Sequence, residues 1–181
     1  MGSHKTPTIK GIFVKSHVEA VRREKGDEGL KLLEEKYAKP LNFKNSENVP
    51  LRDEVRLIEY ALEILSDKPI PKEDFAYEAG KLHFRNFLTT PFAKILFPFF
   101  KNRFRLVTMQ AHNIAGHVFE GVRFYSVGLA DKSVKVVMKN NDYPIDHFRG
   151  FLQEWMEYSG LQGTVIAEDK DGAYEYTLEW K

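Results

Sequence analysis

The sequence feature that most constrains the fold is an aromatic-rich stretch in the middle of the chain, residues 73–107, EDFAYEAGKLHFRNFLTTPFAKILFPFFKNRFRLV. A buried ring stabilises a fold by about 1.5–3 kcal/mol, so this stretch is predicted to form the central core. Its first half predicts a helix, because His83 and Phe87 recur at helical spacing on an apolar face. Pro91 and Pro98 disfavour helical geometry at the residues before them, so we expect a helix, a break and a second short helix.

Rings packed around broken helices either fill a core completely or leave a pocket between them, and both arrangements fit the sequence. If a pocket forms, we expect phenylalanines to supply its apolar walls and histidines to act as its polar anchors. These candidate ligand-binding residues are His83, Phe84, Phe87, Phe97, Phe100 and His112. His83 has a second interpretation, as a buried histidine that is satisfied by one backbone or carboxylate partner.

The amino-acid composition excludes several classes of protein. The chain has 181 residues, no cysteine and a formal net charge of +1. The absence of cysteine excludes disulfides, thiolate catalysis and cysteine-ligated metal clusters, and the balanced charge predicts no nucleic-acid partner. The N-terminus lacks the apolar run of a signal peptide, and charged residues and a proline break the most apolar segment, residues 92–104. We therefore expect a cytoplasmic protein without a membrane span.

The order of the predicted elements gives the fold class. Helical patterns dominate as far as residue 118, and the remainder shows two predicted hairpins with one helix between them. We therefore predict an α+β fold, with an N-terminal helical bundle followed by a strand-strand-helix-strand-strand antiparallel sheet. Residues 1–8 are expected to be a disordered or expression-derived N-terminus. Residues 9–181 are expected to form a single ligand-binding-type domain, with a helical part, 9–118, and an α/β part, 119–181.

Three helices precede the aromatic stretch in this prediction. The first ends near Gly26, and Asp27 has the residue type of an N-cap for the second. Residues 40–50 are polar and predict an exposed loop. From Leu51 to Leu65, apolar residues repeat at three and four positions, which predicts the clearest amphipathic helix of the chain.

The sequence contains no recognisable catalytic motif: no phosphate-binding glycine loop, no nucleophile elbow and no His-Glu-x-x-His. The six histidines are scattered along the sequence, and the five-residue spacing of His112 and His117 does not place them on one helical face. No metal site is therefore predicted. The acidic pair Asp53 and Glu54 is interpreted as solvated charge that complements a helix dipole. These observations predict that the chain is not an enzyme.

Four segments give the chain its resemblance to a known family. They are IKGIFVKSHVEAVRREKGDEGLKLL, FAYEAGKLHFRNFL, DHFRGFLQEWMEYSGL and AYEYTLEW. In these segments the chain resembles an uncharacterised family of paralogues best known from myxobacteria. That family is in turn similar to the superfamily of ligand-binding domains of nitric oxide signalling and Golgi transport, which includes heme nitric oxide/oxygen-binding domains, four-vinyl-reductase-type domains and trafficking-complex subunits. The resemblance implies the same helical part and the same order of strands.

The resemblance makes heme a candidate cofactor. Heme domains of this kind place an axial histidine on the helix before the first hairpin, and His112 lies close to that place in the sequence. They also carry Tyr-x-Ser-x-Arg after the second strand, and its arginine pairs with the heme propionates. The corresponding positions are Met138, Asn140 and Asp142. The propionate clamp is therefore absent, and Asp142 would repel a propionate.

Three functional hypotheses follow from the sequence. The first is a non-enzymatic sensory or regulatory domain that binds a small hydrophobic or amphipathic molecule between the helical part and the sheet. The second is a heme-based gas sensor with His112 as the axial ligand. The third is a protein–protein interaction module or homodimer without a small ligand, in which exposed aromatic residues such as Phe99 or Tyr125 form the interface.

Overall fold

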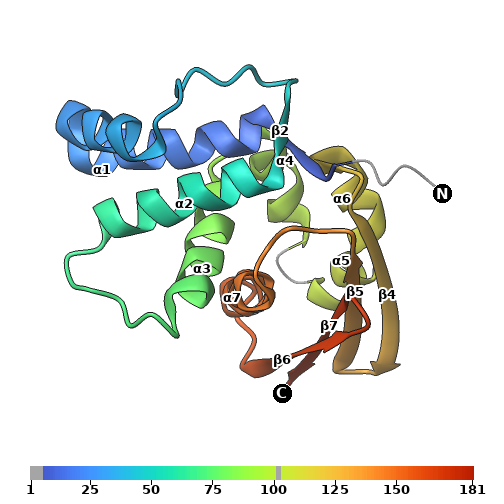
Figure 1. Cartoon of the computed structure of the whole chain (residues 1–181). Coiled ribbons are helices and arrows are strands. Elements are labelled where there is room, and N and C mark those ends of the chain that lie inside the picture. Colours follow the sequence, from blue (N-terminus) through green and yellow to red (C-terminus); the bar gives the residue numbers. More distant parts are fainter. Residues whose placement is uncertain (1–5, 101–102) are drawn as a thin grey trace.

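The computed structural model describes residues 6–100 and 103–181, without the side chains of Phe99 and Phe100. Its elements confirm the predicted fold class, with helices as far as residue 118 and then strand-strand-helix-strand-strand (Figure 1). The helices are α1 (Gly11–Tyr37), α2 (Leu51–Leu65), α3 (Phe75–Leu88), α4 (Pro91–Phe100), α5 (Phe104–Met109), α6 (Ala111–Val118) and α7 (Ile145–Tyr158). The strands are β1 (Thr8–Lys10), β2 (Asn48–Pro50), β3 (Phe119–Glu120), β4 (Arg123–Ala130), β5 (Ser133–Lys139), β6 (Gly163–Lys170) and β7 (Ala173–Trp180).

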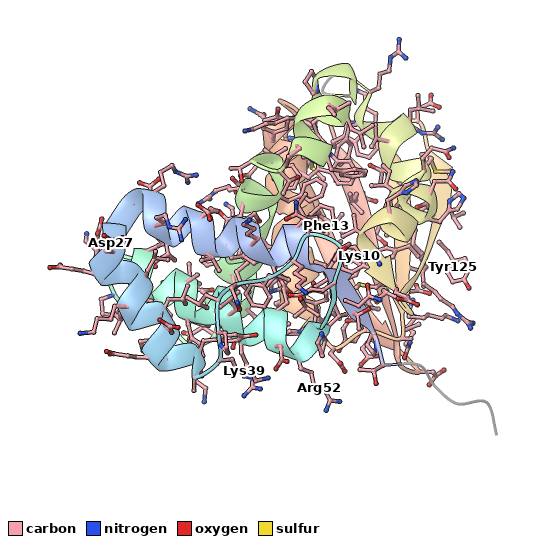
Figure 2. All side chains as sticks on the ribbon, turned by 90° about the horizontal axis from the view of Figure 1, so that it is seen from above. Lys10, Phe13, Asp27, Lys39, Arg52 and Tyr125 are labelled. Carbon is pink, nitrogen blue, oxygen red and sulfur yellow. The ribbon has the colours of Figure 1, made fainter. Side chains whose placement is uncertain are left out.

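The larger sheet has the strand order β4-β5-β7-β6, and its strands pair antiparallel throughout. Helix α7 lies between this sheet and the helical layer of α1, α2 and α3 (Figure 1). Side chains alternate across the sheet as expected for a sheet with one buried face. Val136 of β5 and Tyr176 of β7 are buried on the inner face, whereas Tyr125 of β4 is exposed and points away from the molecule (Figure 2).

A smaller sheet, with the order β2-β1-β3, joins the start of the helical part to the end of α6. The sequence did not predict it, because its strands have two or three residues each and depend on pairing with distant segments. Thr8 begins β1, which differs from the predicted disordered N-terminus, and residues 1–5 of that segment lie outside the described residues.

The N-terminal helices follow the sequence prediction closely. Gly26 has φ 64° and ψ −154°, a conformation that glycine adopts readily, and it divides α1 into two segments. Helix α2 spans the predicted amphipathic stretch. Helix α3 ends at Leu88, and Thr90 accepts a hydrogen bond from the Ala93 amide at the start of α4.

The predicted helix, break and second short helix are confirmed as α3 and α4. The disfavoured helical geometry expected before Pro98 is not found, because Pro98 lies inside α4, near its C-terminal end. A proline there removes a single helical hydrogen bond, which a short helix with an apolar face tolerates.

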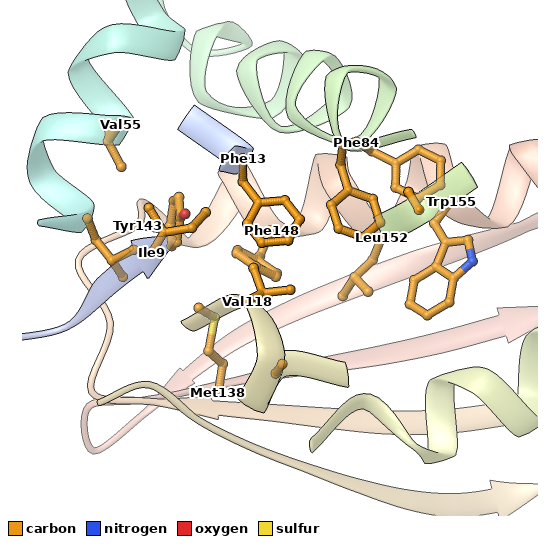
Figure 3. Packing of buried hydrophobic residues seen from close by; sticks show 14 of the residues in the cluster. Ile9, Phe13, Val55, Phe84, Val118, Met138, Tyr143, Phe148, Leu152 and Trp155 are labelled. Carbon is orange, nitrogen blue, oxygen red and sulfur yellow. The ribbon is translucent and has the colours of Figure 1, made fainter. Parts of the chain in front are cut away.

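The hydrophobic core lies between the helices and the sheet. Figure 3 shows Phe148, Leu152 and Trp155 of α7 in this layer, with Phe84 of α3 on the helical side and Met138 of β5 on the sheet side. The predicted central role of the aromatic stretch is therefore confirmed. Within the described ranges, no helix combines the length and the apolar composition that a membrane span requires.

Candidate functional site

A cavity of about 70 Å³ lies in the core where α3, α6 and α7 meet the inner face of the sheet. Helix α6 contributes Ala111, Ile114, Ala115 and Val118 to its wall. The other lining side chains come from α3, α7 and the strands, and all of them except His83 are apolar. The cavity is therefore an apolar space with one polar side chain at its edge.

The structure separates the predicted ligand-binding residues into three groups. His83 and Phe87 line the cavity. Phe84 and Phe97 are buried but pack against other rings and do not line it. His112 is exposed on α6 and does not reach the cavity. Phe100 lies outside the described side chains.

A second feature lies beside the cavity: a buried polar cluster that we define as His17, Glu54, His83 and His147. The four side chains come from α1, α2, α3 and α7 and are at most 2% exposed. His17 Nε2 lies 2.8 Å from Glu54 Oε1. His83 Nδ1 lies 3.7 Å from Glu54 Oε1 and 3.0 Å from His147 Nε2.

Helical spacing explains why these polar side chains point inward. Glu54 lies three residues after Leu51 and four before Ile58, and both are fully buried on the inner stripe of α2. The interpretation of Glu54 as solvated charge is therefore wrong. Glu54 does lie in the first turn of α2, as the helix-dipole rule expects, but its side chain points into the core, where His17 is its partner.

Some polar atoms at the edge of the cluster have hydrogen-bond partners, and others do not. The Asn86 side-chain amide lies 3.0 Å from His17 Nδ1, so both ring nitrogens of His17 have a polar neighbour. Among the described residues, Glu54 Oε2 and the Tyr143 hydroxyl are buried without a partner in hydrogen-bond geometry. The Tyr143 hydroxyl and the Glu54 carboxylate nevertheless interact with each other, because the interaction with Glu54 contributes to the raised pKa of Tyr143.

Burial sets the protonation states in the cluster. It lowers the pKa of His83 to about 3 and that of His147 to about 4, in spite of the charge of Glu54, so both rings are neutral at pH 7. Burial also acts to raise the pKa of Glu54, but the interactions with His83 and His17 outweigh it and lower that pKa. Burial and the nearby Glu54 charge raise the pKa of the Tyr143 hydroxyl well above 10. The cluster is thus a buried carboxylate held among three buried histidine rings.

The sequence prediction missed His17, Glu54 and His147. The available signal was a single histidine on the apolar face of each of three separate helices, together with an acid on the apolar stripe of a fourth. The histidines are scattered along the sequence, but three of them lie together in the fold.

Solved structures of H-NOX proteins share this fold. A mutant of T. Tengcongensis H-NOX matches with a TM-score of 0.65 at 14% identity, over 95% of this chain and 97% of that chain. The Fe(II) unliganded H-NOX protein from K. algicida matches with a TM-score of 0.63 at 12% identity, over 95% and 96% of the two chains. A structure described as probing the function of heme distortion in the H-NOX family matches with a TM-score of 0.66 at 13% identity, over 95% of each chain. At such identities the likeness establishes the fold alone.

The chain belongs to the family described as "Protein of unknown function (DUF2378)", whose model matches residues 4–181. A search of curated proteins gave no match. The predicted resemblance is therefore confirmed for the H-NOX fold, while the likeness to the other domains of that superfamily stays a prediction.

Proposed function

We propose that the chain is a sensory or regulatory domain, without catalytic activity, that binds a small apolar molecule between its helical part and its sheet. The observation that carries this proposal is the apolar cavity of about 70 Å³ at that position. The fold lends support only by analogy, because one H-NOX structure with this fold is described as Fe(II) unliganded, which refers to a ligand of its iron.

The size of the cavity sets the class of ligand. An apolar core cavity of about 150 Å³ in another protein stays dry and binds benzene or xenon. The cavity here, at about 70 Å³, is smaller, so it admits xenon or a diatomic gas without rearrangement. An acyl chain or a larger amphipathic ligand requires α6 to move away from α7.

Xenon binding, followed by methyl NMR of the full chain, tests the proposal. We expect saturable shifts at the methyl groups of Val118, Val136 and Leu152, which line the cavity, and none at Leu33, which is buried elsewhere in the core. Ala115→Leu places added methyls in the cavity and should abolish the shifts. His112→Leu introduces the same side chain on the exposed face of the same helix and should leave them unchanged.

The physiological ligand is sought separately. Headspace analysis of freshly purified protein, and titration with nitric oxide and dioxygen, should show one binding event that Ala115→Leu removes. Absence of xenon shifts in the unmodified chain, or equal shifts in the Ala115→Leu variant, would overturn the proposal.

The heme alternative is favoured by the fold but not by the residues. The axial candidate His112 is exposed, and α6 turns Ala111, Ile114 and Ala115 toward the cavity instead. A porphyrin is several times larger than the cavity. Asp142, at the position of the clamp arginine, forms an ion pair with Arg52, 3.3 Å between Nε and Oδ2. The described residues therefore do not fit a heme held by His112.

The interaction-module alternative has one observation in its favour. Tyr125, Val127 and Leu129 of the edge strand β4 are 49–52% exposed and line up on the outer face of the sheet (Figure 2 labels Tyr125). Phe99, the other predicted interface residue, lies outside the described side chains. Light scattering across a range of concentrations tests this alternative, because a homodimer through β4 should dissociate in a Val127→Lys variant.

A further inference from the structure

We propose that His17, Glu54 and His83 form a binding site for a divalent transition-metal ion in the helical part of the fold. This inference does not depend on the apolar cavity being a ligand site.

The spacing of the donor atoms carries the proposal. One ligand atom each from His17, Glu54 and His83 lie within 4.8 Å of one another. Bonds from zinc to nitrogen or oxygen are about 2.0–2.2 Å long, so donor atoms around a tetrahedral ion lie about 3.3 Å apart. The distances of 2.8 Å from His17 Nε2 to Glu54 Oε1 and 3.7 Å from His83 Nδ1 to Glu54 Oε1 bracket this value. An ion therefore fits among the three side chains with small adjustments.

The unsatisfied atoms are an independent observation. Glu54 Oε2 is fully buried and has no partner in hydrogen-bond geometry among the described residues. A buried carboxylate is costly unless a cation or several donors compensate it. A divalent cation would compensate the carboxylate and give its second oxygen a partner.

Polar residues beside the proposed ligands lie where residues that orient metal-binding histidines usually lie. Metal-bound histidines usually pair their other ring nitrogen with a polar group, which fixes the tautomer. Asn86 occupies this position at His17 Nδ1, 3.0 Å away. The structure places Asn86 Nδ2 at this nitrogen, and a flip of the amide, which exchanges its nitrogen and oxygen, would let Oδ1 accept the Nδ1 proton and leave Nε2 free for the ion. His147 Nε2, 3.0 Å from His83 Nδ1, is the nearest further donor and becomes a fourth ligand after a small shift.

The types of donor atom limit which metal ions the site can bind. Two imidazoles and one carboxylate suit zinc, iron(II), cobalt(II) and manganese(II). Calcium and magnesium prefer all-oxygen sites, so they are excluded.

Metal analysis of the full chain tests the proposal. We expect about one zinc, iron or manganese ion per chain after purification without chelator. Replacement by cobalt(II) should give the visible absorption of a four-coordinate nitrogen and oxygen site, and X-ray absorption should show imidazole scattering at about 2.0–2.1 Å. These two measurements use the unmodified chain, so they do not depend on a variant that folds.

Variants within the proposed site, compared with variants at exposed histidines, test where the ion binds. Glu54→Gln keeps the shape of the side chain and should weaken metal affinity at least a hundredfold, and Asn86→Ala should weaken it about tenfold or more. His112→Gln and His117→Gln remove exposed histidines of α6 and should change nothing. Circular dichroism of each variant confirms that it is folded before metal is measured.

Two results would overturn the proposal. One is an unmodified chain that holds no stoichiometric metal after dialysis against each of the four ions. The other is a folded Glu54→Gln variant that binds the ion as tightly as His112→Gln does, which would place the ion elsewhere. Xenon binding is measured on chelated protein, so failure of the metal site leaves the cavity test intact.

Discussion

The carbonyl oxygen of His147 occupies the place where the Cβ of any residue larger than glycine at position 80 would stand. The same contact is repeated on the other helix, where Gly150 faces the carbonyl of Tyr77. Helices α3 and α7 therefore cross with their backbones in contact. This close crossing brings His83 Nδ1 within 3.0 Å of His147 Nε2 and fixes one side of the buried polar cluster.

Gly80→Ala should destabilise the fold. A methyl group at this position meets backbone atoms of His147 and Phe151, which cannot rotate away as a side chain can. We expect a loss of about 1–3 kcal/mol or more in the free energy of unfolding, measured by urea denaturation. The control is Gly116→Ala, because a Cβ at Gly116 meets nothing within 4 Å and alanine favours the helix by about 0.5–1 kcal/mol. A stabilised Gly80→Ala variant would show that the two backbones are not in contact.

The parts of the fold that could be predicted from the sequence are those with a local sequence signal. The helix from Leu51 to Leu65 follows from its own periodicity. The turn at Asp171 and Gly172 follows from the residue types, because an Asp-Gly pair readily adopts the positive φ that both residues show. Each of these elements is determined by residues within a few positions of one another. The order of the elements then restricts the fold class.

The buried polar cluster could not be predicted in the same way. His17 and Glu54 are 37 residues apart, and His83 and His147 are 64 residues apart. Their meeting depends on how four helices cross, and each residue read in its own helix looks like an isolated polar residue. The cavity could not be predicted for the same reason, because the fit of side chains from α3, α6 and α7 determines its volume.

The ion pair between Glu154 of α7 and Arg85 of α3 should make stability depend on pH. Burial acts to raise the pKa of Glu154, but Arg85 and Lys81 outweigh it and lower that pKa below 4.5. The unfolded chain therefore binds a proton more readily, and the stabilisation, which is present above pH 4.5, is lost as the pH falls below that value.

Glu154→Gln should accordingly lose about 0.5–1 kcal/mol at pH 7 and less at pH 3, measured by urea denaturation at each pH. Glu19→Gln is the control, because Glu19 pairs with Arg22 on the surface, where both side chains are largely exposed. An equal loss in the Glu154→Gln variant at pH 3 and pH 7 would mean that packing, and not charge, joins the two helices.

Titration of the chain with hemin should give no stoichiometric axial complex. His112 is exposed and the cavity-facing side of α6 is apolar, so α6 offers the iron no histidine on the side that lines the cavity. We expect the same weak absorption spectrum for the unmodified chain and for His112→Ala. A sharp Soret band at one heme per chain that disappears in His112→Ala would establish the heme alternative and a rearranged α6.

Phe84 should be among the most costly residues to truncate, although it does not line the cavity. It is fully buried, and its ring lies within 6.4 Å, centroid to centroid, of those of Phe87, Phe97, Phe151, Trp155 and Tyr158. Phe84→Ala leaves a hole that these rings cannot fill, so we expect a loss of about 3–5 kcal/mol in the free energy of unfolding. Ile95→Ala, at a side chain that is 67% exposed on the neighbouring α4, should cost less than about 0.5 kcal/mol. Thermal or urea unfolding of the two variants makes the comparison, and equal losses would contradict the placement of Phe84 at the centre of the core.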